Sequence, residues 1–148
     1  MRGAVPRNAD KEDYMSDNRQ ICEEYAKIGA ELIETEDALI DIRNSQATII
    51  YLASDYAKTD KGRAVMGQCE KVQDKYKWGI PADFTITLFL PNVEGKSDEA
   101  IRRIILHELL HIGIDFKDDG TEAYSINPHD IEDFKMLIDR WGTDWVEV

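Results

Sequence analysis

The spacing of apolar residues predicts three amphipathic helices. In residues 17–36, 97–113 and 127–141, apolar side chains recur three or four positions apart with charged residues between them. This spacing collects the apolar side chains on one helical face. A short apolar set at residues 39–42 predicts a turn or an extension of the first helix.

Three segments between the first two predicted helices have the residue pattern of β-strands. Residues 47–53 and 82–90 are rich in β-branched and aromatic side chains, and apolar residues alternate along the second of these segments. Residues 64–72 form a weaker strand candidate that contains Gly67. Together they predict a small, mainly antiparallel sheet of three strands.

The order of these elements indicates an α+β fold. A helix, a sheet, a second helix, a loop and a third helix follow one another, with the loop at residues 114–126, which are rich in Asp, Gly, Thr and Ser. Residues 1–16 mix charge with Gly, Pro and Asn without periodicity, which predicts a disordered N-terminal arm. We expect a single domain over residues 17–148.

The second predicted helix carries an HExxH motif, formed by His107, Glu108 and His111. Residues four apart lie on one helical face, so both imidazoles could bind one ion while the glutamate lies beside it as a base. Ser97 is suited to cap this helix and Gly113 to end it. The alternative is a helix whose two histidines are only hydrogen-bonded at the edge of the core.

A third ligand is available in His129, the last of the three histidines in the chain. Catalytic zinc sites use three protein ligands and keep one position open. Asn127 is suited to cap the last helix and Pro128 to occupy its first position, which would place His129 in the first turn. Glu122 or Glu132 could also supply the third ligand.

Three further residues are candidates for supporting roles. Asp130 and Asp133 could accept a hydrogen bond from a ligating imidazole, or could only cap the helix and face water. Tyr124 could stabilise an oxyanion, or could pack on the core with its hydroxyl at the surface.

The C-terminal half of the sequence resembles the phage metallopeptidase family. The resemblance rests on HELLHIGIDFKDDGTEAYSINPHDIEDFKMLIDRWGTDW, residues 107–145, and on Asp83-Phe84 in ADFTITLFLP. It implies that His107, His111 and His129 are metal ligands and that Glu108 is the catalytic glutamate.

The sequence is more distantly similar to SprT-like proteases, which also place a third histidine after HExxH. It lacks the longer HExxHxxGxxH spacing and the Met-turn of metzincins. A minimal zincin-like domain with an N-terminal helix, an HExxH helix and a C-terminal ligand-bearing helix is therefore expected.

Composition and charge argue against several classes of function. The net charge of −12 argues against a general affinity for nucleic acid. No apolar run approaches the length of a membrane span, and Cys22 and Cys69 form no CxxC pair. We expect free thiols, no membrane insertion and a cytoplasmic location; oligomeric state cannot be read from the sequence.

The hypothesis is a zinc metallopeptidase with one ion, acting on a peptide or protein substrate. A metal-activated water would attack the amide while Glu108 serves as general base. One alternative is a catalytically silent, metal-stabilised binding protein of phage or prophage origin. Another is a zinc hydrolase for a different bond, such as a phosphodiester, although the clusters typical of two-metal sites are missing from the sequence.

Overall fold

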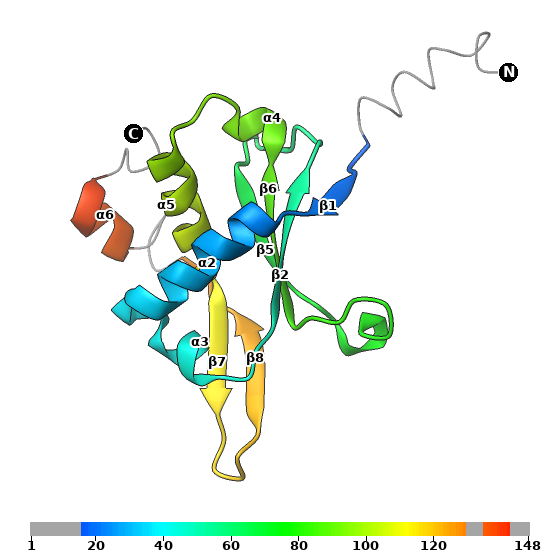
Figure 1. Ribbon diagram of the computed structural model, residues 1–148, viewed down its shortest axis with the longest axis vertical. Helices are drawn as coiled ribbons and strands as arrows, with labels where there is room; N and C mark the ends of the chain where they lie inside the picture. The colour runs from blue at the N-terminus through cyan, green and yellow to red at the C-terminus, as the bar shows by residue number, and fades with distance from the viewer. Residues whose placement is uncertain (1–15, 130–134, 143–148) are drawn as a thin grey trace, which may run out of the picture.

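The computed structural model describes residues 16–129 and 135–142. Its strands are β1 (Arg19–Ile21), β2 (Ile49–Ser54), β3 (Thr59–Asp60), β4 (Arg63–Ala64), β5 (Gly67–Lys71), β6 (Phe84–Phe89), β7 (Ile112–Phe116) and β8 (Glu122–Ile126). Its α-helices are α2 (Glu23–Thr35), α3 (Ile40–Asn44), α4 (Leu90–Val93), α5 (Asp98–Leu109) and α6 (Lys135–Trp141), with short 3₁₀ turns η2 (Asp37–Leu39) and η3 (Asp74–Tyr76). The fold is α+β, as the sequence predicts (Figure 1).

The main sheet has four strands in the order β1-β2-β6-β5. The three strands predicted from the sequence, β2, β6 and β5, are neighbours in it, but the prediction of three strands was wrong because β1 adds a fourth. The predicted first helix accordingly begins at Glu23, not at residue 17. The central pair, β2 and β6, is parallel, with Ile49 opposite Phe84, whereas both outer pairs are antiparallel.

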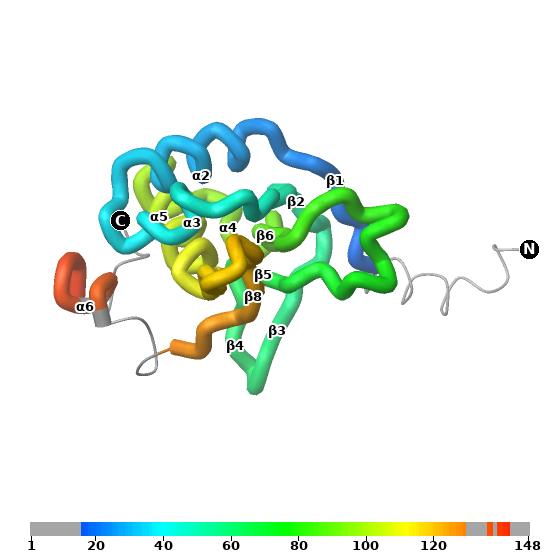
Figure 2. Tube along the Cα trace, turned by 90° about the horizontal axis from the view of Figure 1, so that it is seen from below, coloured from blue at the N-terminus to red at the C-terminus, as the bar shows by residue number. Residues whose placement is uncertain are grey.

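Helices α2 and α5 cover one face of this sheet (Figures 1 and 2). Between the layers lies a core in which the side chains of Phe84, Ile86 and Leu88 are 0% exposed. Helix α2 comes unusually near β2 at Gly29, where an added Cβ would collide with the Tyr51 hydroxyl. The absence of a side chain at Gly29 therefore sets how closely this helix packs on the sheet.

The HExxH helix is shorter than the sequence predicts. Its start is as expected, because the Ser97 hydroxyl accepts a hydrogen bond of 3.1 Å from the Ala100 N–H. Its end is not: α5 stops at Leu109, and Gly113 lies within β7. The helical spacing of apolar residues therefore continues to Gly113, although the helix itself ends at Leu109.

The loop predicted at residues 114–126 is a β-hairpin. Strands β7 and β8 pair antiparallel, with Ile112 opposite Ile126 and Phe116 opposite Glu122. A turn containing Gly120, at φ +89°, joins them. The hairpin extends beyond the main sheet (Figure 1) and returns the chain to the end of α5.

The last helix also begins later than predicted. Asn127, Pro128 and His129 form no helical turn, and the described part of the helix is α6, which ends at Trp141 before Gly142 at φ +83°. The Trp141 ring lies 4.2 Å from the Arg103 guanidinium of α5, so α6 packs beside the HExxH helix.

The predicted N-terminal arm, residues 1–16, lies outside the described residues except for Ser16. None of the described helices combines the length and the hydropathy that a membrane span requires.

Candidate metal centre

The two histidines of the HExxH motif lie at the C-terminal end of α5. His107 occupies the last helical turn, and His111 follows in the turn that leads into β7. The His111 N–H still donates to the Glu108 carbonyl, at 3.1 Å, which keeps the chain wound beyond Leu109. As a result the two imidazoles lie on the same side, with ring centroids 5.3 Å apart.

The third histidine, His129, follows strand β8 at the base of the hairpin, where the chain has returned to the end of α5. The His129 ring centroid is 4.9 Å from that of His107 and 4.6 Å from that of His111. The Nε2 atoms of His107 and His129 are 3.0 Å apart, and one ring nitrogen from each histidine falls within a group no wider than 4.8 Å. The three imidazoles therefore meet although 17 residues, which include the hairpin, separate His129 from His111 in the sequence.

This arrangement fits a tetrahedral ion. Nitrogens held at about 2.0–2.1 Å from one tetrahedral zinc lie roughly 3.3 Å apart, close to the 3.0 Å between His107 and His129. Three neutral imidazoles are a donor set that suits zinc. His107, His111 and His129 could thus hold one ion and leave a fourth position open.

Asn127 fixes the position of His111. The Nδ1 of His111 lies 2.7 Å from the Asn127 carbonyl oxygen, and the Asn127 N–H donates to the His111 carbonyl. The Asn127 amide also donates to the carbonyl oxygens of Leu110 and Ile112, the latter at 3.2 Å. A proton on Nδ1 leaves Nε2 as the metal-binding nitrogen, which is how a backbone carbonyl orients a ligating histidine.

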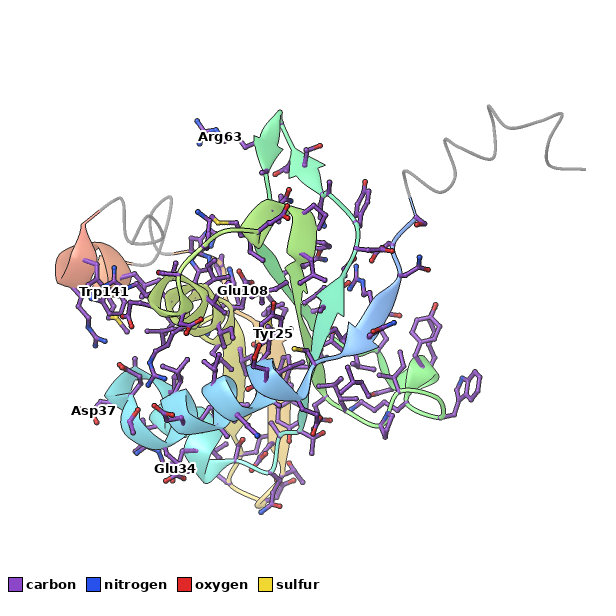
Figure 3. All side chains as sticks on the ribbon, turned by 45° about the horizontal axis from the view of Figure 1, so that its top comes forward. Tyr25, Glu34, Asp37, Arg63, Glu108 and Trp141 are labelled. Carbon is purple, nitrogen blue, oxygen red and sulfur yellow. The ribbon has the colours of Figure 1, made fainter. Side chains whose placement is uncertain are left out.

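Glu108 lies beside the histidine cluster. Its side chain is 8% exposed, and its Oε2 is 4.0 Å from the Nε2 of His107. Figure 3 shows it between α5 and the main sheet. On β5, a Cβ added to Gly67 would lie 3.1 Å from both the Cγ and the Oε2 of Glu108. Gly67 therefore provides the space that the carboxylate occupies.

Comparison with known proteins identifies the family. A family model described as "Putative phage metallopeptidase" matches residues 18–148. The chain belongs to this family. No curated protein and no solved structure matches the sequence. The family match covers both β5 and α5, so Gly67 and Glu108 lie within it, and the family description names a metal-dependent peptidase.

Cys69 lies near Glu108 but is not part of the group of three histidines that could hold an ion. Burial raises the pKa of the Cys69 thiol, and the carboxylates of Glu108 and Glu70 raise it further. A thiol kept protonated in this way is a poor zinc ligand, since zinc binds the thiolate. Cys22 and Cys69 are both free thiols, as expected from the sequence.

The remaining candidate residues are not part of the histidine cluster in the described structure. The Tyr124 ring packs 5.6 Å from that of Phe84, and its hydroxyl donates to Glu122 at 2.7 Å. Burial first, and then this hydrogen bond, raise the pKa of the Tyr124 phenol to about 12. Glu122 also accepts from the Gln46 N–H at 3.0 Å and is not one of the clustered ligands. Asp130, Glu132 and Asp133 lie outside the described residues.

Sequence reasoning missed two residues of this site. Gly67 was assigned only to a weak strand, although an isolated glycine in a strand often marks a close approach by another group. Asn127 was assigned as a helix cap, whereas its side chain turns back to the end of α5. The pattern Asn-Pro fits both roles, so the sequence alone could not separate them.

Proposed function

We propose that the protein is a zinc-dependent peptidase in which His107, His111 and His129 hold one ion and Glu108 is the general base. The observation that carries the proposal is the convergence of three imidazoles from two distant segments, with a buried carboxylate 4.0 Å from one of them. A structural zinc site generally has four protein ligands and needs no base. The three-histidine set with Glu108 favours catalysis.

The bound ion would polarise the scissile carbonyl and lower the pKa of a coordinated water. Glu108 would accept the proton of that water and pass it to the leaving amine. Its burial against Gly67 restricts the carboxylate to a position beside the histidines, so little side-chain freedom is lost when it acts. The carbonyl of Asn127 would hold His111 in the tautomer that binds the ion.

The location of β5 supports a polypeptide substrate. This strand is at one edge of the main sheet, and its first residue, Gly67, adjoins Glu108. An extended peptide bound along an edge strand pairs through its backbone. Such a peptide would bring an amide bond alongside the base, which is the geometry that peptide hydrolysis requires.

The test combines metal content with cleavage of unfolded casein. The full chain, Glu108→Gln and His129→Ala are each purified and loaded with zinc, and bound zinc and casein cleavage are measured. We expect one ion per wild-type chain, retention of that ion with at least a hundredfold loss of cleavage in Glu108→Gln, and loss of both in His129→Ala. Glu122→Ala is the control for the competing ligand assignment and should retain both.

The results separate this proposal from a silent binding domain. Zinc bound by the wild type without cleavage of casein or of a broad peptide library would favour a metal-stabilised binding protein. Absence of zinc from the wild type would overturn the metal centre itself. Loss of zinc in Glu122→Ala would transfer the third ligand role from His129 to Glu122.

A further inference from the structure

The segment that joins β5 to β6 presents large apolar side chains to solvent. Trp78 is 90% exposed, Tyr76 48% and Ile80 39%. The backbone N–H groups of Gly79 and Ile80 both donate to the Tyr76 carbonyl, so these side chains are displayed by a hydrogen-bonded turn. Figure 1 shows the segment projecting from the main sheet. Apolar side chains gathered in this way on a surface typically mark a contact site.

Positive charge accompanies these aromatic side chains. Within residues 16–129 and 135–142, Lys71 and Lys75 form no ion pair, and the Lys75 ammonium lies 5.1 Å from the centre of the Tyr76 ring. Lys77, by contrast, is paired with Asp74 and Asp83. Residues 71–80, here called the aromatic loop, therefore combine exposed rings with two unneutralised cations in a chain of net charge −12.

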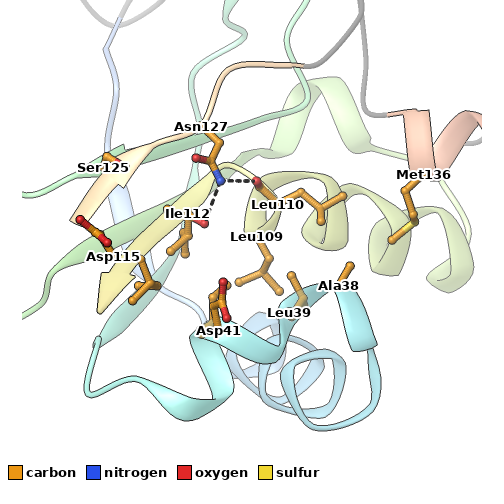
Figure 4. A pocket seen from close by; sticks show the side chains of 13 residues that line it. Ala38, Leu39, Asp41, Leu109, Leu110, Ile112, Asp115, Ser125, Asn127 and Met136 are labelled. Atoms are coloured by element: carbon orange, nitrogen blue, oxygen red, sulfur yellow. Dashed lines mark hydrogen bonds between the residues drawn. The ribbon is translucent and has the colours of Figure 1, made fainter. Parts of the chain in front are cut away.

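A groove of opposite charge lies between α2 and the α4–α5 segment. It consists of two adjoining hollows, of about 390 and 490 Å³, which share Tyr25 and Ile101 as walls. The lining of both is more apolar than polar, and its further apolar members are Ile28, Leu90, Pro91 and Val93. The hollow beside Asn127 differs, because its lining is mainly polar (Figure 4).

Tyr25 gives this groove a polar group at its centre. The residue is only 7% exposed, and its hydroxyl makes no hydrogen bond within the described part of the chain. A largely buried hydroxyl without a protein partner gains free energy when an occupant supplies one. The groove therefore suits an occupant that is mainly apolar and carries one hydrogen-bonding group.

The rim of the groove is acidic. The carboxylates among its lining residues are Glu24, Asp55, Glu94, Asp98 and Glu99. The cation among them, Arg102, is paired with Glu31 at 2.8 Å. An apolar floor inside a negative rim favours an apolar occupant with positive charge beside it and disfavours an acidic one.

We propose that the aromatic loop of one chain docks into this acidic groove of a second copy. Trp78 would contact the apolar floor, where its indole N–H can donate to the Tyr25 hydroxyl. The cations of the loop would face the carboxylates of the rim. Loop and groove are different surfaces, so the contact joins unlike parts of two copies. It involves no residue of the candidate metal centre.

Sedimentation equilibrium of the full chain tests the proposal. One loop in one groove is a small interface, so we measure mass from about 10 μM to 1 mM protein and expect wild type to associate. Trp78→Ala, Lys75→Glu and Glu94→Lys alter exposed side chains and should each weaken association at least about tenfold. Lys117→Glu and Asp118→Lys make the same charge changes in the β7–β8 turn and should associate as wild type does.

Mixing two variants identifies both surfaces. Trp78→Ala retains the groove and Glu94→Lys retains the loop, so an equal mixture should recover association that neither variant shows alone. The recovered species should be pairs, because only one intact contact can form between the two variants. Raising NaCl from about 50 to 500 mM should weaken wild-type association several-fold, since opposite charges contribute to it.

Four results would overturn the proposal. Wild type that stays monomeric over the whole range is the first, as expected if residues 1–15 of the same chain occupy the groove. Wild-type association in Trp78→Ala is the second, and wild-type association in Glu94→Lys is the third. The fourth is Trp78-dependent binding of a monomeric chain to phosphatidylglycerol vesicles, which would assign the aromatic loop to a lipid surface.

Discussion

The Nδ1 of His111 lies 2.7 Å from the carbonyl oxygen of Asn127, two residues before His129. One segment thus orients one imidazole of the cluster and delivers another. The Asn127 amide secures this segment by donating to the carbonyl oxygens of Leu110 and Ile112, at the end of α5 and the start of β7. Carbonyls at a helix end lack helical partners, so these bonds also complete the termination of α5.

Replacing Asn127 with alanine should weaken zinc binding more than it weakens the fold. The change removes two side-chain hydrogen bonds that hold the segment carrying His129, and outer hydrogen-bond partners of metal ligands typically contribute 10- to 100-fold in affinity. We expect a loss of that size in a zinc titration against a competing chelator, with about 1 kcal/mol lost from the free energy of unfolding of the metal-free chain.

Asn92→Ala is the matched control. The Asn92 amide also donates to two backbone carbonyls, those of Lys58 and Val65, but away from the histidines. It should cost a similar amount of stability and leave zinc affinity unchanged. If the two variants bind zinc with equal affinity, the role of Asn127 in supporting the metal site is rejected.

Alanine at Gly67 should lower cleavage without lowering zinc content. The new Cβ would lie 3.1 Å from the Oε2 of Glu108, so the carboxylate must shift by a few tenths of an ångström or rotate. A displaced base transfers the proton less efficiently, and we expect kcat for casein-derived peptides to fall roughly 10- to 100-fold. KM and the number of zinc ions per chain should stay near wild-type values.

Gly79→Ala provides the comparison for this change, because nothing lies within 4 Å of a Cβ at Gly79. Its kcat should match that of wild type. Wild-type kcat in Gly67→Ala would show that Glu108 tolerates the added methyl group, and the positioning role of Gly67 would be rejected.

The contact between α2 and β2 predicts a pair of opposite stability effects. Gly29→Ala places a Cβ against the Tyr51 hydroxyl and should lower the free energy of unfolding by about 1–3 kcal/mol, because a packed interface must open. Tyr51→Phe removes a buried hydroxyl that has no hydrogen-bond partner among the described residues. That variant should be as stable as wild type or more so, by up to about 1 kcal/mol.

Urea denaturation of both variants and of the double variant checks these expectations. Because the two residues touch, the double variant should recover part of the loss caused by Gly29→Ala. Strict additivity of the two effects would contradict the contact.

Asp83 should make stability depend on acid pH. Burial alone would raise the pKa of Asp83, but hydrogen bonds from the Lys77 ammonium and from the N–H and hydroxyl of Thr48 outweigh it and hold the pKa below 3.8. Since the folded-state pKa is below the unfolded value, the carboxylate contributes stability at neutral pH. That contribution declines as the pH falls through 3.8 towards the folded-state pKa.

Urea denaturation at several pH values tests this linkage. Asp83→Asn should be less stable than wild type at pH 7, and the difference should shrink as the pH drops below about 4. Asp118→Asn, in the exposed β7–β8 turn, should follow the wild-type curve. A constant difference between Asp83→Asn and wild type from pH 7 to pH 3 would contradict the assignment.

The sequence predicted those features that depend on residues close together in the chain. Ser97 caps α5 as expected because a hydroxyl before an amphipathic run satisfies exposed helix N–H groups. His107 and His111 could be assigned to one face from their spacing alone. The segments that became β2 and β6 were also recognisable, since β-branched and aromatic residues concentrate there, whereas β5 has neither and was only a weak candidate.

The remaining errors concern signals that are ambiguous or not local. Ile112 and Ile114 alternate as strand residues should, but they follow Leu109 and Leu110 so closely that the helical pattern continues through Gly113. Strand β1 has only three residues, too few for a period to be visible. Nothing in the segment of β2 indicates that its neighbour on one side is parallel, because that depends on where β6 arrives.

The parallel pairing of β2 with β6 delays folding during synthesis, because the two strands are far apart in the sequence. Ile49 pairs with Phe84, so β2 must wait for a strand made much later, and α5, the hairpin and His129 follow later still. A nascent chain would therefore contain Glu108 and two histidines well before the third imidazole leaves the ribosome. Under the proposed ligand assignment, the emerging chain cannot complete its metal site, and so stays inert towards neighbouring polypeptides, until the segment that carries His129 has been made.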